Sequence, residues 1–195
     1  DVYKRQAQQS LRTLTNASRR APFDIKLPLT IYNTSCYRGI PGKYIAAGPL
    51  ASRWLQQQFA SDATLIRCGA QVLGEPAAGY LSHPGYAALP KAPYRYQEML
   101  GVIWRENPSC YLEDGEQAVL MAALMETDNA GRPLIDAWIK RSGLSADAWL
   151  EKLFEATVIP FYHLLCRYGV ALIAHGQNVT PVSYTHLTLP TKLEV

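Results

Sequence analysis

The longest helix of the chain is predicted in the stretch SADAWLEKLFEATVIPFYHLLCRYG, which runs from Ser145 to Gly169. Ser145 is a favourable N-cap, and Asp147 suits the positive end of the helix dipole. Gly169 is typical of a helix stop, and Pro160 is expected to kink the helix. One apolar face is predicted from Leu150, Leu153, Phe154, Phe161, Leu164, Leu165 and Tyr168.

Shorter segments around this helix predict strands and one further helix. Residues 170–174 are predicted as a short buried strand, and residues 25–33 as one strand with Pro28 at an edge or a bulge. Residues 100–105 and 118–125 are predicted as strands of one sheet. Residues 49–60 predict a helix whose apolar face holds Leu50, Trp54, Leu55 and Phe59. These elements indicate an α+β fold, with a mixed or antiparallel sheet and packed helices.

Composition limits the class of protein. The chain has 195 residues, of which 48% are apolar and 18% charged, which is typical of a folded domain and excludes disorder as its main state. The net charge of +3 comes without a basic cluster, which argues against a nucleic-acid or membrane partner. The four scattered cysteines fit reduced thiols in the cytoplasm, and no Cys or His pair has the spacing of a zinc site.

The two ends of the sequence differ in character from the rest. Residues 1–6 and about 181–195 resemble translated adaptor sequence, so we exclude both from the fold expectation. Residues 7–180 are then expected to be a fragment of a longer protein. The alternative is that the final residues form a genuine, poorly ordered tail.

Three groups of residues are candidates for binding anions. Ser10, Arg12 and Thr13 place two hydroxyls beside a guanidinium, a combination that can bind phosphate oxygens. The alternative is a helix N-cap with a solvated Arg. The second group is Lys26 and Arg38. Lys26 could meet a nucleotide phosphate or lie on a solvated face of its strand. Arg38, in a glycine-rich turn, could bind a carboxylate or phosphate or be an ordinary surface residue.

The third group is His175, Gln177 and Asn178, which the strand at 170–174 would place at its end. Histidine suits acid–base work or carboxylate recognition, and the two amides could orient a phosphate or a metal-bound water. The alternative is a turn whose polar groups satisfy one another. Common nucleotide-binding and nucleophile-elbow signatures are absent from the sequence, so the residues alone predict an anion-binding α+β fragment.

Four long runs, at residues 10–20, 26–42, 94–107 and 162–178, resemble the IucA/IucC family, siderophore synthetases that work without a nonribosomal peptide synthetase. The resemblance extends over nearly all of residues 7–180. It implies part of the palm and thumb region of such an enzyme, an amide-forming ligase that uses ATP and Mg²⁺. A citrate-type carboxylate, citrate or a citryl monoamide, would be activated as an acyl-adenylate. A hydroxylysine-derived amine, N6-acetyl-N6-hydroxylysine, would then displace AMP.

The resemblance also implies roles for single residues. The family's S-x-R-T motif, which binds ATP phosphates, corresponds to Ser10, Arg12 and Thr13, and its Lys and Arg correspond to Lys26 and Arg38. Thr34 falls where a carboxylate-contacting Thr would lie. The H-x-Q-N motif is His175, Gln177 and Asn178, with His175 near the carboxylate and Asn178 near nucleotide or metal. We expect Ser10, Arg12, Lys26, Arg38 and His175 to converge on one cleft.

The chain also departs from the family pattern. The N-terminal lobe and the acidic residues expected to hold Mg²⁺ beyond H-x-Q-N are not found, so no metal ligand is assigned and the chain alone is expected to be inactive. A non-catalytic anion- or nucleotide-binding domain is the rival reading. A ferric-reductase-like reading of the C-terminal region is disfavoured, because closely spaced cysteines for an iron–sulfur site are lacking. A homodimer of the parent enzyme stays open.

Overall fold

The computed structural model describes residues 5–8, 10–16, 22–33, 36–89, 91, 98–184 and 191–194. The chain divides into two compact units. Unit 1 comprises Asp1–Trp54 and Gly74–Asn107, and unit 2 comprises Leu55–Leu73 and Pro108–Val195. In the described part of the chain, no helix is both long and apolar enough to cross a lipid bilayer.

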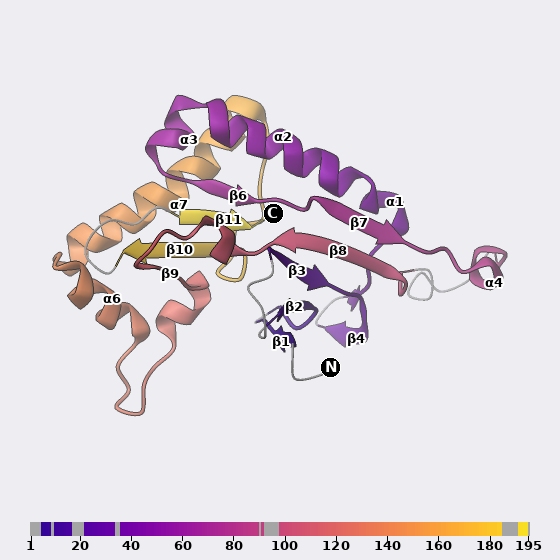
Figure 1. The fold of residues 1–195 in the computed structure, drawn as a ribbon, viewed down its shortest axis with the longest axis horizontal. Coiled ribbons are helices and arrows are strands. Elements are labelled where there is room, and N and C mark those ends of the chain that lie inside the picture. Colours follow the sequence, from indigo (N-terminus) through magenta and orange to yellow (C-terminus); the bar gives the residue numbers. More distant parts are fainter. Residues whose placement is uncertain are drawn as a thin grey trace. The chain divides into compact units, whose positions relative to one another are not determined.

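Unit 1 is built on an antiparallel five-stranded sheet with the order β1-β2-β3-β8-β7 (Figure 1). Its strands are β1 (Arg5–Ala7), β2 (Thr13–Asn16), β3 (Phe23–Lys26), β8 (Gly101–Glu106) and β7 (Ala77–Tyr80). The strand predicted over residues 100–105 is thus confirmed as β8. The register pairs Thr13 of β2 with Lys26 of β3, so two predicted site residues are direct cross-strand neighbours.

The single strand predicted over residues 25–33 is wrong. The chain forms β3 and then, after Leu27 and Pro28, a separate hairpin of β4 (Leu29–Asn33) and β5 (Cys36–Arg38). Proline lacks the N–H that a ladder needs, so Pro28 ends the pairing and the chain enters another sheet. Arg38 closes the hairpin opposite Leu29.

The described residues of unit 1 also form the helices α1 (Gly42–Ile45) and α4 (Pro84–Ala87) and the start of α2 (Ala47–Ser61). The boundary between the two units falls within α2. The helix predicted over residues 49–60 is confirmed as α2. Its predicted apolar face is only half right: Leu55 and Phe59 are buried, whereas Leu50 and Trp54 are 62% and 39% exposed. Ser52 is buried instead, and its hydroxyl is satisfied there by a hydrogen bond from the Glu75 backbone N–H at 2.6 Å.

Unit 2 contains a four-stranded sheet with the order β6-β11-β10-β9. The strands are β6 (Gln71–Leu73), β11 (Thr191–Glu194), β10 (Val179–Tyr184) and β9 (Glu116–Ala118). β11 runs parallel to β6, and the other pairs are antiparallel. Residues 181–184 and 191–194, which lie in the adaptor-like end of the sequence, therefore form the last four residues of β10 and the whole of β11, and Pro181 and Val182 are buried.

The prediction that residues 118–125 form a strand beside residues 100–105 is wrong. Only the short β9 ends at Ala118, and Met121–Met125 form the 3-10 helix η3. β9 pairs with β10 in the sheet of unit 2, whereas β8 lies in the sheet of unit 1. The turn-rich link between them contains a second 3-10 helix, η2 (Pro108–Tyr111). A short apolar run spans too few residues for its hydrophobic periodicity to distinguish a strand from a helical turn.

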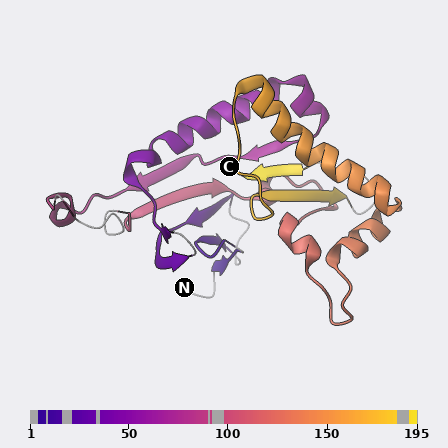
Figure 2. The same cartoon turned by 180° about the vertical axis from the view of Figure 1, so that it is seen from behind.

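The other helices of unit 2 are α3 (Ala63–Arg67), α6 (Leu134–Ser142) and α7 (Ala146–Tyr168). α7 confirms the predicted N-cap at Ser145 and the predicted helix stop at Gly169. The Ser145 hydroxyl accepts from the Ala148 N–H at 3.3 Å, and Gly169 ends the helix with a left-handed φ of 68°. The helix continues through Pro160, which is buried. In both views of the fold, α7 runs beside β10 and β11 (Figures 1 and 2).

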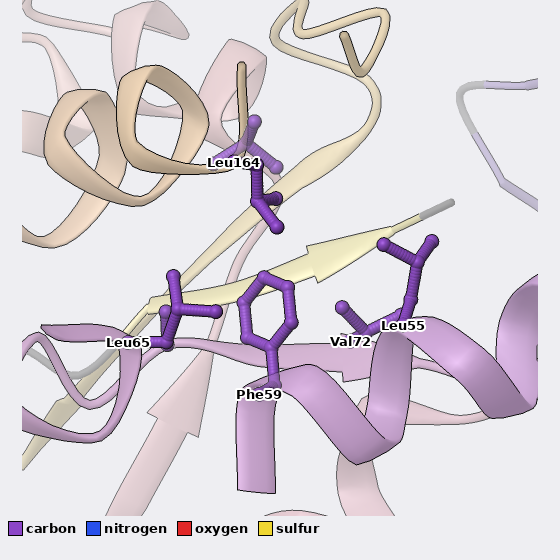
Figure 3. Packing of buried hydrophobic residues seen from close by; sticks show 7 residues of the cluster. Leu55, Phe59, Leu65, Val72 and Leu164 are labelled. Atoms are coloured by element: carbon purple, nitrogen blue, oxygen red, sulfur yellow. The ribbon is translucent and has the colours of Figure 1, made fainter. Parts of the chain in front are cut away.

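The core of unit 2 lies between the helices and its sheet. Leu55 and Phe59 of α2, Leu65 of α3, Val72 of β6 and Leu164 of α7 pack together (Figure 3). A second cluster joins Leu124 of η3, Trp138 of α6, and Trp149 and Leu153 of α7. The predicted face of α7 is partly wrong, because Phe154 and Leu165 are 55% and 47% exposed.

The buried strand predicted over residues 170–174 is also wrong. This segment has no strand pairing, and Ile173 is 81% exposed. Only Val170 and Leu172 pack against the core, both of them partly buried. The segment is a connection from the end of α7 to β10, so its apolar composition does not reflect burial on two sides.

Candidate functional site

The predicted anion-binding residues of unit 1 gather around the turn that precedes β2. In this turn the Thr13 N–H donates to the Ser10 carbonyl at 2.8 Å, and the Leu27 N–H donates to the Arg12 carbonyl at 2.8 Å. The Thr13 hydroxyl lies 3.4 Å from that of Ser10. Thr13 is fully buried, whereas Ser10, Arg12 and Lys26 are half-buried. The motif therefore forms a turn and strand start, with both hydroxyls on one side of a short loop.

Arg12 connects this turn to the segment that follows β5. Its guanidinium Nη1 donates to the Gly39 carbonyl at 2.8 Å. Because Gly39 follows Arg38 directly, the contact brings the S-x-R-T turn next to the predicted carboxylate-binding Arg. An Arg side chain has five N–H donors in a planar fork, a shape that suits phosphate and carboxylate groups. The solvated-Arg alternative does not describe this half-buried, bonded side chain.

A carboxylate that the sequence reasoning did not assign lies at the same place. The Glu98 side chain lies against Gly39, and the Ile40 N–H donates to the Glu98 carbonyl at 3.0 Å. Burial raises the pKa of Glu98, and the charge of Lys43 partly offsets that rise. Thr34, the predicted carboxylate contact, lies outside the described residues.

A buried polar network supports the sheet behind these residues. Asp24, two positions before Lys26, is 1% exposed and accepts from the Asn107 amide at 2.7 Å and from the Gln8 amide. Its cross-strand neighbour Arg105 forms an ion pair with Glu75 at 3.2 Å. Buried polar groups need such partners. The Asp24 bonds link β3 to Asn107, the residue after β8, and through Gln8 and the Thr15 hydroxyl to β2.

In unit 2, His175, Gln177 and Asn178 lie in a turn before β10 rather than at the end of a strand. The Asn178 N–H donates to the His175 carbonyl at 2.8 Å, and the Asn178 side-chain amide donates to the Ile173 carbonyl at 3.0 Å. His175 and Gln177 are exposed and Asn178 is half-buried. The turn thus presents the imidazole and one amide to solvent.

The ring of His175 has close neighbours on both nitrogens. The Gln177 N–H lies 3.3 Å from Nδ1, and the Asn178 side-chain nitrogen lies 3.4 Å from Nε2. A neutral imidazole has one bare nitrogen and one N–H, so it can accept only one of these two bonds. Its other nitrogen carries a proton that could be donated to a carboxylate.

The structure therefore brings together one part of the predicted site. Ser10, Arg12, Thr13, Lys26 and Arg38 are neighbours within unit 1, and His175, Gln177 and Asn178 form one turn of unit 2. The convergence of the two groups on one cleft stays a prediction.

A further polar cluster in unit 2 was not predicted. The Asp62 carboxylate accepts from His163 Nε2 at 2.9 Å and from the Tyr168 hydroxyl at 2.8 Å, both on α7. Its other oxygen caps α3 through the N–H groups of Thr64 and Leu65. The hydrogen bond from His163 is the main reason that the pKa of Asp62 lies far below its usual range. The hydrogen bond that Tyr168 donates to Asp62 raises the pKa of Tyr168. An Asp immediately before a helix is the signal that could have predicted the cap.

The described residues contain no group of three or more His, Cys, Asp or Glu side chains placed to hold a metal ion. A hollow of about 360 Å³ opens in unit 2 beside Phe59, Ile66, Val72 and Tyr111. None of its lining residues is a predicted site residue.

Two family models match the chain. The model of the IucA / IucC family matches residues 3–126, which include the whole anion-binding group of unit 1. The model described as ferric iron reductase FhuF-like transporter matches residues 147–193, which include α7 and the His175 turn.

Known proteins resemble the chain over most of its length. An aerobactin synthase of Escherichia coli is 74% identical over 174 residues, which are 89% of this chain and 30% of the relative. The solved structure of aerobactin synthetase IucC of Klebsiella pneumoniae has a TM-score of 0.83 and 61% identity, over 98% of this chain and 32% of that one. The ATP-bound aerobactin synthetase IucA of K. pneumoniae matches at a TM-score of 0.75 and 22% identity, over 97% and 34%, and shows the fold alone. The chain thus spans about 30% of the length of the curated relative.

Proposed function

The chain belongs to the IucA/IucC family, and from this we propose that it forms part of the catalytic region of an ATP-dependent, amide-forming siderophore synthetase of the aerobactin type. The observation that carries the proposal is the 74% identity to an aerobactin synthase over 174 residues. The clustering of Ser10, Arg12, Thr13, Lys26 and Arg38 in unit 1 supports it, because adenylation brings two anions together. A cytoplasmic location, in keeping with the scattered cysteines, belongs to the same proposal.

The proposed reaction has two steps. A carboxylate oxygen of citrate or a citryl monoamide attacks the α-phosphorus of ATP, and the bond to pyrophosphate breaks. The nitrogen of a hydroxylysine-derived amine, N6-acetyl-N6-hydroxylysine, then attacks the acyl carbon, loses a proton and expels AMP. Both steps need positive groups and N–H donors that offset the repulsion between carboxylate and phosphate and the charge that develops at phosphorus.

The turn at Ser10 and its neighbours would bind the ATP phosphates. The hydroxyls of Ser10 and Thr13 lie on one side of the loop, and the Lys26 ammonium is carried on the paired strand. Arg12 donates to the Gly39 carbonyl, so its guanidinium would meet the phosphate in a restricted orientation. An ATP-bound solved structure of the same fold is consistent with this assignment.

Arg38, Thr34 and His175 would recognise the carboxylate substrate. Arg38 can hold a carboxylate through two parallel hydrogen bonds, and the protonated nitrogen of His175 can add a third. Gln177 and Asn178 would orient the nucleotide or a metal-bound water. Mg²⁺, when bound to the phosphates, supplies charge neutralisation. Among the described residues, no group of three or more His, Cys, Asp or Glu side chains is placed to hold it.

The experiment that tests the proposal compares Arg38→Lys and Arg38→Ala in the full-length enzyme. Lys offers a mobile point charge in place of the planar fork, so both variants should lose activity almost equally. A lost charge-assisted hydrogen bond costs about 1.5–3 kcal/mol, or roughly 10- to 100-fold in kcat/KM for the carboxylate. His175→Ala should impair carboxylate use and leave nucleotide binding largely intact.

The exposed Arg53 of α2 provides the matched control, because Arg53→Lys should leave kcat/KM unchanged. Near-normal activity of Arg38→Lys would exclude the bidentate role. In the rival reading, in which Arg38 is a surface residue of an anion-binding domain, both Arg38 variants would behave like Arg53→Lys.

Assays of the 195-residue chain by itself distinguish ATP binding from catalytic turnover. We expect weak ATP binding at best, and no ATP-dependent condensation of citrate with hydroxylated lysine derivatives. Isothermal titration with ATP and an assay of AMP release measure the two properties. Robust AMP formation by this chain would contradict its proposed inactivity.

A further inference from the structure

The turn that carries His175, Gln177 and Asn178 rests directly on the 3-10 helix η3. The Ala122 N–H donates to the Gly176 carbonyl at 3.0 Å. A Cβ atom built on Gly176 would lie 2.9 Å from Ala122 Cβ and 3.1 Å from its Cα and backbone N. Real Cβ atoms almost never approach another atom so closely. The backbone of the turn therefore contacts η3 with no room for a side chain at position 176.

The requirement at position 176 is for space and not for a special backbone conformation. Gly176 is not among the glycines with a positive φ, unlike Gly169. An alanine at this position would therefore carry no conformational penalty of the kind that a left-handed residue has. Any effect of Gly176→Ala should come from the collision with Ala122, and removing the Ala122 methyl group should relieve part of it.

The 3-10 helix η3, on which the turn packs, is itself anchored in the core of unit 2. Leu124 is 2% exposed and packs with Trp138, Trp149 and Leu153 of α6 and α7. Met121 packs against both core clusters of unit 2. Because packed interiors yield little to an added methyl group, a collision at Ala122 would displace the turn more than η3.

The opposite side of the turn is held more weakly. Asn178 is tied to the Ile173 carbonyl, but Ile173 lies in the exposed connection after α7, which has no strand pairing. The contact between Gly176 and Ala122 thus joins the turn to η3, which is anchored in the core, in addition to the turn's direct connection to the buried Val179 of β10.

We propose that Gly176 and Ala122 are positioning residues, whose contact sets where His175, Gln177 and Asn178 stand relative to the core of unit 2. This rests on the proposed function, in which these three side chains serve carboxylate and nucleotide. The shape of the contact demands the smallest residue between His175 and Gln177. Ala122 acts through that backbone contact and touches no substrate.

The test is a size-exchange cycle in the full-length synthetase: Gly176→Ala, Ala122→Gly and the double variant. Gly176→Ala should lower kcat/KM for the carboxylate by about 10- to 100-fold, since a misplacement of about 1 Å can cost 10²-fold. Its ATP affinity should change less. Ala122→Gly alone should have a small effect. The double variant should recover part of the lost activity, because the 2.9 Å Cβ–Cβ collision is gone while the 3.1 Å approaches to the Ala122 backbone remain. The cycle measures this coupling directly.

Gly79→Ala in β7 is the matched control. A Cβ atom there would lie 3.5 Å from Val102 Cγ1, an ordinary contact, and Gly79 has no positive φ. This variant should keep kcat/KM within about twofold. If Gly176→Ala does not accumulate as folded protein, Ala122→Val tests the same contact from the other side and should produce the same selective loss.

The proposal is overturned if Gly176→Ala, or in its place Ala122→Val, keeps normal kcat/KM, or if the double variant is no better than Gly176→Ala. A uniform loss of active enzyme with unchanged KM and a lowered Tm would assign Gly176 a purely structural role, which also overturns it. Failure of the proposed function has a different signature: His175→Ala would then be as active as the parent enzyme.

Discussion

The predicted site residues of unit 1 and those of unit 2 are held in place in different ways. In unit 1, Thr13 and Lys26 are paired in register across two strands of an antiparallel sheet, and the Arg12 guanidinium ties their turn to Gly39. In unit 2, His175, Gln177 and Asn178 lie in a turn outside regular structure, between an exposed connection and β10. The first group depends on a ladder of backbone bonds, the second on a few contacts with its neighbours.

This difference predicts different sensitivities to substitution. A side chain on a paired strand keeps its place when one neighbour is changed, because the backbone ladder carries its position. A turn moves when the element beneath it moves. Substitutions that loosen α7 or η3 should therefore disturb the His175 turn and leave the sheet of unit 1 intact.

The largest effect is expected from Leu164→Ala. Leu164 is fully buried in the core of unit 2, and its carbonyl accepts from the Val170 N–H at the end of α7. Loss of a buried Leu side chain costs about 2–5 kcal/mol, measurable by denaturant unfolding. Leu165→Ala, at a neighbouring position that is half exposed, should cost far less. Hydrogen exchange should show faster opening of α7 and β10, and equal loss of protection in β3 and β8 would contradict the comparison.

A smaller effect is expected from Arg12→Ala in unit 1. The variant removes the hydrogen bond to Gly39, and a charged donor contributes at most about 1.5–3 kcal/mol. The cost should be below this range, because Arg12 is only half-buried and the pairing of β2 with β3 remains. Unfolding by denaturant measures the loss, and Arg53→Ala on the exposed side of α2 is the control. A loss as large as that of Leu164→Ala would show that the sheet does not hold this group independently.

The smallest effect is expected from Asp62→Asn, and it depends on pH. The pKa of Asp62 is lowered in the folded chain, chiefly by the hydrogen bond from His163. A lowered pKa stabilises the fold above the unfolded pKa of about 3.9, and this contribution is lost as the pH falls toward the folded pKa. The Asn variant should be less stable at neutral pH, and the difference in unfolding free energy should narrow as the pH falls from about 5 toward 2. Chemical unfolding across that range tests the sign, and a gap that widens in acid would contradict it.

Local signals in the sequence predicted the helix ends and the strand whose structure depends on residues only a few positions away. Ser145 and Gly169 predicted both ends of α7, because caps act through backbone groups within a few positions. The run at 100–105 predicted β8, and the motif residues predicted a group that the structure assembles around Arg12, Thr13 and Lys26. The structure shows that these residues lie close together, and their role in a binding site stays a prediction.

Tertiary structure decided which apolar segments are buried and which distant residues come into contact. Apolar runs at 118–125 and 170–174 became a 3-10 helix and an exposed connection, because burial depends on which distant surface covers a segment. The same reason placed Leu50 and Phe154 at the surface and brought Asp62 to His163 and Tyr168. The contact of Gly176 with Ala122 joins residues 54 positions apart. Such a contact exists only once η3 and β10 are packed, so the sequence alone determined which residues form the turn, and the fold decided where the turn rests.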